Sequence, residues 1–483
     1  MSKPRYPALF EINTRAWLWR LSQAAGKPVT LATVDDAILD DFARRGFDWI
    51  WLLSVWRTGT ASRAVSRGTP AWQAEFRAAL PDLTQDDICG SGFAISGYEV
   101  DEALGGTAAL AAFRARLAAR GLRLMLDFVP NHTALDHPWT KTHPDFYVQG
   151  SDCRVESDQG PRVLAHGRDP NFPGWPDTLQ LNYANPALQA AQMAELQTIA
   201  GQCDGVRCDM AMLVLPDVFQ RTWGLAAAPF WPKAIAAVRD VHRGFTFMAE
   251  AYWDLEWELQ QQGFSYCYDK RLYDRLRHAD AGSILAHLGA GLDYQDRLAR
   301  FLENHDEPRA AAVFPWPRHQ AAAIVTCFAP GLRFFHQGQL DGAQVRVPVH
   351  LRRAPAEAHN ADVVAFYDSL LAALRTEAFR DGAWSLIAPQ SAWDGNPTGR
   401  DFICQAWQSS TGRYVVVVNY SDHQGQCRLR LPFDDLAGHQ FRLVDVMGSE
   451  VYGREGGELV EPGLYIDLGA WRFNVFRLDR VAP

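Results

Sequence analysis

The sequence predicts an α/β fold: a (β/α)8 TIM barrel with a short insertion after its third strand and an antiparallel β-sandwich at its C-terminal end. Over the first ~380 residues, short apolar runs alternate with helix-like segments, the pattern of βα units around a parallel sheet. Residues 133–182 break this rhythm, and the last hundred or so residues read as short strands separated by turns. We therefore expect a barrel at 1–132 and 183–380, an insertion at 133–182 and a sandwich at 381–483.

Eight apolar runs are the candidate barrel strands. They are continuously apolar rather than alternating, as expected for parallel strands covered on both faces. In chain order they are Leu9–Asn13, Trp49–Leu53, Leu122–Phe128, Gly205–Asp209, Phe245–Glu250, Phe264–Tyr268, Arg300–Asn304 and Leu332–His336. The stretches between them include the expected helices Thr107–Arg120, Pro186–Gly201 and Pro232–Arg243.

The insertion and the C-terminal part differ in texture from the barrel. Residues 133–182 are rich in Pro, Asp, Gly and Trp, and a connection of this length is expected to be functional or a small subdomain. A helix is expected at Asp362–Thr376. The strand-like runs that follow it are Ile403–Gln408, Tyr414–Asn419, Gln426–Leu431, Phe441–Val446 and Trp471–Leu478.

Bulk composition narrows the class of protein. The formal charge is -9, and no basic run suggests a nucleic-acid partner. No stretch approaches the ~20 apolar residues that span a bilayer, so no membrane partner is expected. The start of the chain lacks the apolar stretch of a secretory signal, and the eight cysteines form no CxxC pair. We therefore expect a cytoplasmic protein with reduced thiols, and the sequence leaves its oligomeric state open.

Four short segments end strand-like runs in charged or imidazole side chains: Leu124–His132, Gly205–Asp209, Phe247–Glu250 and Phe301–Asp306. Active sites of (β/α)8 barrels lie at the C-terminal ends of the strands, so Asp209, Glu250 and Asp306 are expected to converge there.

The order Asp…Asn-His, Arg-x-Asp, Glu, Asn-His-Asp resembles the conserved regions of the α-amylase superfamily, glycoside hydrolase family 13. The resemblance implies a retaining enzyme, a hydrolase or transglycosylase, acting on α-glucans, maltooligosaccharides or α-glucosides. By the same resemblance, Asp209 is the nucleophile, Glu250 the acid/base and Asp306 the stabiliser of the transition state. The insertion would be domain B, and the sandwich domain C. Retention implies ~5–5.5 Å between the carboxyls of Asp209 and Glu250.

The resemblance also implies substrate-binding residues. His132 and His305 would donate to sugar hydroxyls in the −1 subsite, and Tyr98 would stack under the −1 ring. Arg207 lies two residues before the predicted nucleophile, on the same strand face, and can hold it ionised. Arg309 could reach the sugar pocket or could pair with a local carboxylate.

The chain departs from the family pattern at several positions. Met212 and Leu213 stand where many α-amylases carry Lys-His, so an apolar acceptor side is predicted; with Trp253 it favours transfer to a sugar. Hydrolysis stays equally open. Ile95 stands where exo-acting α-glucosidases often place an aspartate, and Arg333 replaces a family proline.

No cofactor is expected to be required, although calcium stays open. Asn131 corresponds to a common calcium ligand at the junction of the barrel and domain B. Asp152, Glu156, Asp158 and Asp169 offer further oxygen donors. Alternatively, Asn131 hydrogen-bonds within the junction.

A second class of function is also open. Some relatives of this family have lost catalytic carboxylates and act as sugar-binding or scaffold proteins. The presence of Asp209, Glu250 and Asp306 argues against this class. The sequence does not indicate the linkage, the chain length of the substrate, or endo or exo action.

Overall fold

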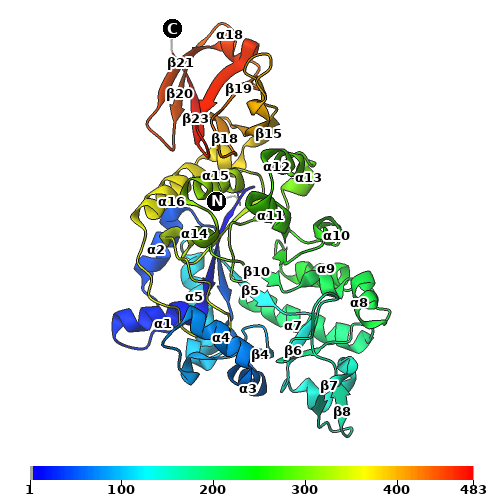
Figure 1. Ribbon diagram of the computed structural model, residues 1–483. Coiled ribbons are helices and arrows are strands. Elements are labelled where there is room, and N and C mark those ends of the chain that lie inside the picture. Colours follow the sequence, from blue (N-terminus) through cyan, green and yellow to red (C-terminus); the bar gives the residue numbers. More distant parts are fainter. Residues whose placement is uncertain (1–3, 482–483) are drawn as a thin grey trace.

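The predicted barrel is confirmed by the computed structural model, which describes residues 4–481. Eight parallel strands close in the order β1-β14-β13-β12-β11-β10-β5-β2 (Figure 1). Their bounds are β1 Ala8–Asn13, β2 Trp49–Leu53, β5 Arg123–Phe128, β10 Gly205–Cys208, β11 Thr246–Ala249, β12 Tyr266–Tyr268, β13 Leu298–Arg300 and β14 Leu332–His336. All but β13 lie within one or two residues of their predicted positions or inside them.

The seventh strand is displaced from its prediction. It ends at Arg300 rather than continuing to Asn304. The next residues are buried, but Asn304 forms a turn in which its Oδ1 accepts from the backbone N–H of Asp306 and of Glu307, at 2.9 Å each. Asp306 therefore stands on a loop beyond β13, whereas Asp209 and Glu250 directly follow β10 and β11.

Helices cover the outside of the barrel. The longer ones are α1 Thr14–Ala25, α2 Asp36–Arg45, α5 Gly106–Ala118, α7 Pro186–Gln202, α9 Trp231–Val241, α11 Lys270–His278, α15 Trp316–Cys327 and α16 Ala361–Leu374. Local sequence fixes their ends. The Asp35 side chain accepts from the N–H of Ala37 at the start of α2, and Gly46, with φ 90°, terminates that helix.

Two excursions extend from the C-terminal ends of the barrel strands. After β2, helices α3 Thr60–Gly68 and α4 Pro70–Ala79 lie between the paired strands β3 Trp56–Thr58 and β4 Ile95–Val100. After β5, residues 133–182 form a small subdomain rather than a structureless loop. Strand β6 His132–Ala134 pairs with β9 Thr178–Gln180, and β7 Gln149–Val155 pairs with β8 Arg162–Leu164 (Figure 1).

The C-terminal part is the predicted antiparallel sandwich. One sheet has the order β15-β17-β18-β23-β20-β21 and the other β16-β19-β22. Their bounds are β15 Ala383–Ile387, β16 Gln390–Ser391, β17 Phe402–Gln408, β18 Arg413–Asn419, β19 Gly425–Leu429, β20 Gln440–Asp445, β21 Val451–Glu455, β22 Leu464–Leu468 and β23 Phe473–Arg480. Side chains from both sheets form one core between them.

The sandwich packs on the barrel end opposite the excursions (Figure 1). Trp407 of β17 donates its indole N–H to the carbonyl of Phe328 at 2.9 Å, and its ring packs edge-on against Tyr6, just before β1. All eight cysteines are free thiols. Within residues 4–481, no helix is long and apolar enough to cross a membrane.

Candidate active site

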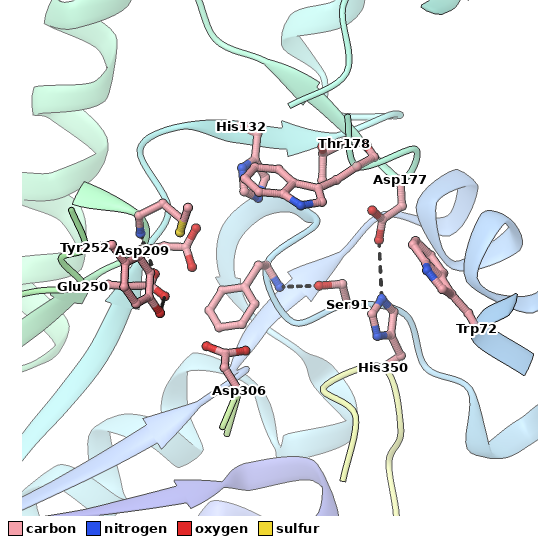
Figure 2. Close-up of a pocket in the computed structure, with 13 residues that line it drawn as sticks. Trp72, Ser91, His132, Asp177, Thr178, Asp209, Glu250, Tyr252, Asp306 and His350 are labelled. Carbon is pink, nitrogen blue, oxygen red and sulfur yellow. Dashed lines mark hydrogen bonds and ion pairs between the residues drawn. The ribbon is translucent and has the colours of Figure 1, made fainter. Parts of the chain in front are cut away.

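One cavity at the C-terminal ends of the barrel strands is lined by all three predicted catalytic carboxylates, Asp209, Glu250 and Asp306 (Figure 2). Their side chains come from the ends of β10 and β11 and from the loop after β13. The cavity volume is about 310 Å³. This is at the low end of the roughly 300–1,000 Å³ of ligand pockets and suits a short segment of substrate.

Arg207 holds two of these carboxylates. Its fully buried guanidinium lies 2.7 Å from Asp209 Oδ1 and 2.7 Å from Glu250 Oε2. Only the contact to Asp209 has hydrogen-bond geometry, because Nη2 of Arg207 makes no hydrogen bond within residues 4–481. The burial of the guanidinium is offset by the nearby carboxylates, which raise the pKa of Arg207 well above its usual value.

Glu250 has two further hydrogen bonds. The backbone N–H of Met210 donates to Oε2 at 2.6 Å, and the hydroxyl of Tyr252 donates to Oε1 at 2.8 Å. Met210 has φ 42°, a conformation that non-glycine residues rarely adopt and that is enriched at functional sites. The strained turn after Asp209 therefore aims a backbone donor at Glu250.

The surroundings of the three carboxyls raise the pKa of Glu250 and Asp209 and lower that of Asp306. Burial raises the pKa of Glu250 to about 7; Arg207 opposes this rise, and Asp209 and Asp306 add to it. Burial also raises the pKa of Asp209, against the charge and hydrogen bond of Arg207. Partial burial of Asp306 is outweighed by the charge and hydrogen bond of His305, which hold its pKa at about 2. Near neutral pH, Glu250 can therefore carry a proton, whereas Asp306 is ionised.

His305 links Asp306 to a buried glutamate on β1. Its Nε2 lies 2.9 Å from Asp306 Oδ2, and its Nδ1 lies 2.5 Å from Glu11 Oε1. Burial lowers the pKa of His305, but the two carboxylates more than offset this and raise it well above the usual value. The imidazolium fixes the orientation of Asp306, whose side chain is 43% exposed.

Of the other predicted substrate-binding residues, His132 lines the cavity and Tyr98 does not. His132 lines the cavity beside Trp175, and burial lowers its pKa to about 4, so its ring is neutral at pH 7. Tyr98 does not reach the cavity. Strand β4 turns it toward the barrel wall, where its hydroxyl donates to the carbonyl of Val129 at 3.1 Å. The aromatic side chains that line the cavity from this excursion are Phe93 and Trp72 instead.

Arg309 takes the second of its two predicted roles. Its Nη1 lies 2.6 Å from Glu303, a buried local carboxylate, and its Nε donates to the carbonyl of Val345 at 3.0 Å. Met212 and Leu213 are 0% and 3% exposed. They are core residues and cannot form the apolar acceptor surface predicted for them.

The residues present at the junction do not fit a calcium ion. The side-chain oxygen of Asn131, its backbone carbonyl and the carbonyl of Leu181 all accept from the amide nitrogen of Gln180, at 3.0, 3.0 and 3.1 Å. A neutral amide thus occupies the position between three oxygens where a cation would be bound. No cluster of three His, Cys, Asp or Glu side chains suited to a metal occurs in residues 4–481.

Several lining residues were missed by the sequence reasoning. Tyr252 carries a weak signal, since it follows Glu250 by two residues. Phe93, Trp175, Asp177 and His350 carry none, because they stand on irregular segments whose approach to the barrel mouth is set by tertiary packing.

Comparison with known proteins identifies the family. The family model described as the α-amylase catalytic domain matches residues 46–360. This is well over half of the chain, so the protein belongs to the α-amylase family.

Individual relatives are distant. The α-amylase MalA of Haloarcula japonica is 24% identical over 382 residues, covering 75% of this chain and 53% of MalA, so the chain spans about half the length of this curated relative. The noncanonic maltogenic α-amylase AmyB of Thermotoga neapolitana has a TM-score of 0.71 at 18% identity, with 98% of each chain covered. The α-amylase of Geobacillus thermoleovorans, solved with acarbose, has a TM-score of 0.69 at 17% identity, with 99% of each chain covered. These structures share the fold.

Proposed function

We propose that this protein is a retaining enzyme acting on α-glucans, maltooligosaccharides or other α-glucosides. Asp209 is the nucleophile, Glu250 the general acid and then base, and Asp306 the stabiliser of the transition state. The observation that carries the proposal is that three carboxyls converge in one small cavity, where the pKa of Glu250 is raised to about 7 and that of Asp306 is lowered to about 2. An acid and an ionised carboxylate side by side are what glycoside cleavage requires.

In the first step, Asp209 attacks the anomeric carbon while Glu250 gives its proton to the glycosidic oxygen, and the leaving sugar departs. The product is a covalent β-glycosyl ester on Asp209. One guanidinium, that of Arg207, contacts both carboxyls and keeps them close together, as the short separation in retaining enzymes requires. Its charge also favours the ionised form of the nucleophile.

In the second step, Glu250, now a carboxylate, takes a proton from the attacking hydroxyl, and the ester bond to Asp209 breaks. Asp306 is held by His305 and faces the cavity, where it can accept hydrogen bonds from ring hydroxyls as positive charge develops on the sugar. Neutral His132 can donate to a further hydroxyl or accept from it.

Water and a second sugar can both attack the intermediate. The buried Met212 and Leu213 provide no acceptor surface, so the predicted preference for transfer loses that support. We therefore favour hydrolysis. The ratio of hydrolysis to transfer can be measured as the number of new reducing ends per glycosidic bond cleaved.

Azide rescue tests the mechanism. With an activated aryl α-glucoside, Glu250→Ala plus azide should give the α-glucosyl azide, because the intermediate forms and azide replaces water. Asp209→Gly plus azide should give the β-glucosyl azide by direct displacement. A single anomer from both variants, or full activity of either without azide, would contradict the assignment.

A further inference from the structure

We propose that Asp177 and His350 close the cavity end opposite Glu250 and bind the terminal hydroxyl groups of the substrate, so that the enzyme acts on non-reducing chain ends. This inference rests on the proposed function and names the substrate end that the same site takes. Neither side chain belongs to a motif or directly follows a predicted strand.

The pair spans the cavity between two segments that are distant in the chain. Asp177 directly precedes β9 in the excursion after β5, and His350 stands in the segment that follows β14. Asp177 Oδ2 and His350 Nε2 are 3.7 Å apart, and both residues line the cavity (Figure 2). A glucan chain continuing in this direction would meet this pair.

Asp177 has unused hydrogen-bonding capacity. It is 3% exposed, and within residues 4–481 its Oδ2 has no hydrogen-bond partner. The contact to His350 is too long to be a hydrogen bond. Buried carboxylate oxygens are normally paired, because leaving one unpaired costs free energy. A sugar hydroxyl would supply the missing donor.

His350 is held in place before substrate arrives. Its ring centroid lies 4.9 Å from that of Trp72 and 5.3 Å from that of Phe76, both on α4. Its backbone carbonyl accepts from the N–H of Cys89 at 2.9 Å. The imidazole is therefore fixed beside Asp177, and Trp72 adds apolar surface to the same end of the cavity.

The position of the acid gives the direction of the substrate. Glu250 must stand beside the glycosidic oxygen, so the leaving part of the substrate lies on its side of the cavity. Asp177, His350 and Trp72 lie at the other end, beyond Asp306 (Figure 2). The hydroxyls that reach this end belong to the non-reducing side of the sugar.

The first test uses the unmodified protein and two substrates, maltoheptaose and maltoheptaose with a 4,6-O-ethylidene group on its non-reducing end. We expect cleavage of the free chain and at least a ~100-fold lower rate for the blocked chain. Similar rates would overturn the inference while leaving the proposed function intact. Cleavage of neither would overturn the proposed function and the inference together.

The second test pairs substrate and protein changes. Removal of the 4- or the 6-hydroxyl of the terminal glucose of an aryl α-maltoside should lower kcat/KM of the wild type about 10–100-fold, the effect of losing a hydrogen bond to a charged group. For Asp177→Asn, kcat/KM on the unmodified aryl α-maltoside should already be lower by a similar factor. Removal of either hydroxyl should then lower kcat/KM of this variant little further. Asp152→Asn, on the exposed β7 strand of the same excursion, is the control and should discriminate as the wild type does. Equal sensitivity of wild type and Asp177→Asn to both deoxy substrates would overturn the inference.

Discussion

The pH dependence of turnover should report the protonation of Glu250, and Tyr252 offers a way to shift it. Because Glu250 must be protonated to act as the acid, kcat/KM should fall as pH rises through its pKa of about 7. The Tyr252 hydroxyl donates to Glu250 Oε1 at 2.8 Å and stabilises the ionised form. Tyr252→Phe removes this donor, so the pKa of Glu250 should rise.

The size of the shift follows from the hydrogen bond that is lost. A neutral donor contributes about 1 kcal/mol net, and one pKa unit corresponds to about 1.4 kcal/mol. The alkaline limb should therefore move upward by roughly half to one pH unit. The remaining donor to this carboxyl, the backbone N–H of Met210, keeps the shift from being larger.

The assay is kcat/KM for a maltooligosaccharide between pH 5 and 9, for wild type, Tyr252→Phe and the control Tyr465→Phe, a partly exposed tyrosine on β22. We expect an alkaline midpoint near 7 for wild type and control, and a higher midpoint for Tyr252→Phe. A wild-type midpoint near the ordinary glutamate value, or a downward shift in Tyr252→Phe, would show that Glu250 is not the group that titrates.

Three further perturbations test the surroundings of the site. Glu11→Gln should lower the pKa of His305 and so reduce the free energy of unfolding. The loss should be largest below about pH 6.5 and should shrink as pH rises through the raised pKa of His305. Urea unfolding at pH 5.5 and pH 9 checks this, and an equal loss at both pH values would contradict it. Gln180→Leu should destabilise the junction by about 2–4 kcal/mol, because the side-chain oxygen of Asn131 and the carbonyl of Leu181 lose their donor, while the carbonyl of Asn131 keeps the N–H of Leu181. Excess EDTA should leave the wild-type melting temperature unchanged, and a drop with EDTA would show that a metal is bound. Arg333→Met should lower the free energy of unfolding, measured with a chemical denaturant, by about 3–5 kcal/mol. The buried guanidinium donates to the carbonyls of Cys327 and Tyr6, at 2.7 Å each, and to that of Phe379. A loss under about 1 kcal/mol would show that these carbonyls find other donors.

The barrel could be predicted because its strands are apolar runs with few polar interruptions. The strand before Asp209 and the strand before Glu250 are fully buried on both faces, and this pattern is visible in the sequence. The seventh strand was placed too late because the buried residues after Arg300 continue the apolar run without joining the sheet. In most of the barrel the buried apolar residues are also paired in the sheet, but the buried residues after Arg300 are not.

The candidate site could be predicted only where residues follow strands directly. Asp209 and Glu250 meet this condition, and Asp306 was found through its motif although its strand was misplaced. Tyr98 was predicted to stack in the cavity, but Phe93 lines it instead. The pairing of β3 with β4 directs Tyr98 toward Val129, and this pairing is not visible in the sequence. Such choices depend on tertiary packing between excursions, which short-range sequence patterns do not encode.

Product analysis with maltoheptaose distinguishes an active glucan-cleaving enzyme from a protein that only binds sugar. Purified wild type and Asp209→Asn are incubated with the heptasaccharide, and products are resolved by chain length while reducing ends are counted. We expect new products from wild type: shorter sugars with matching reducing ends from a hydrolase, or longer sugars with few new reducing ends from a transferase. The rate for Asp209→Asn should be at least ~10³-fold lower. No products from wild type, or the same products at the same rate from Asp209→Asn, would rule out the proposed function.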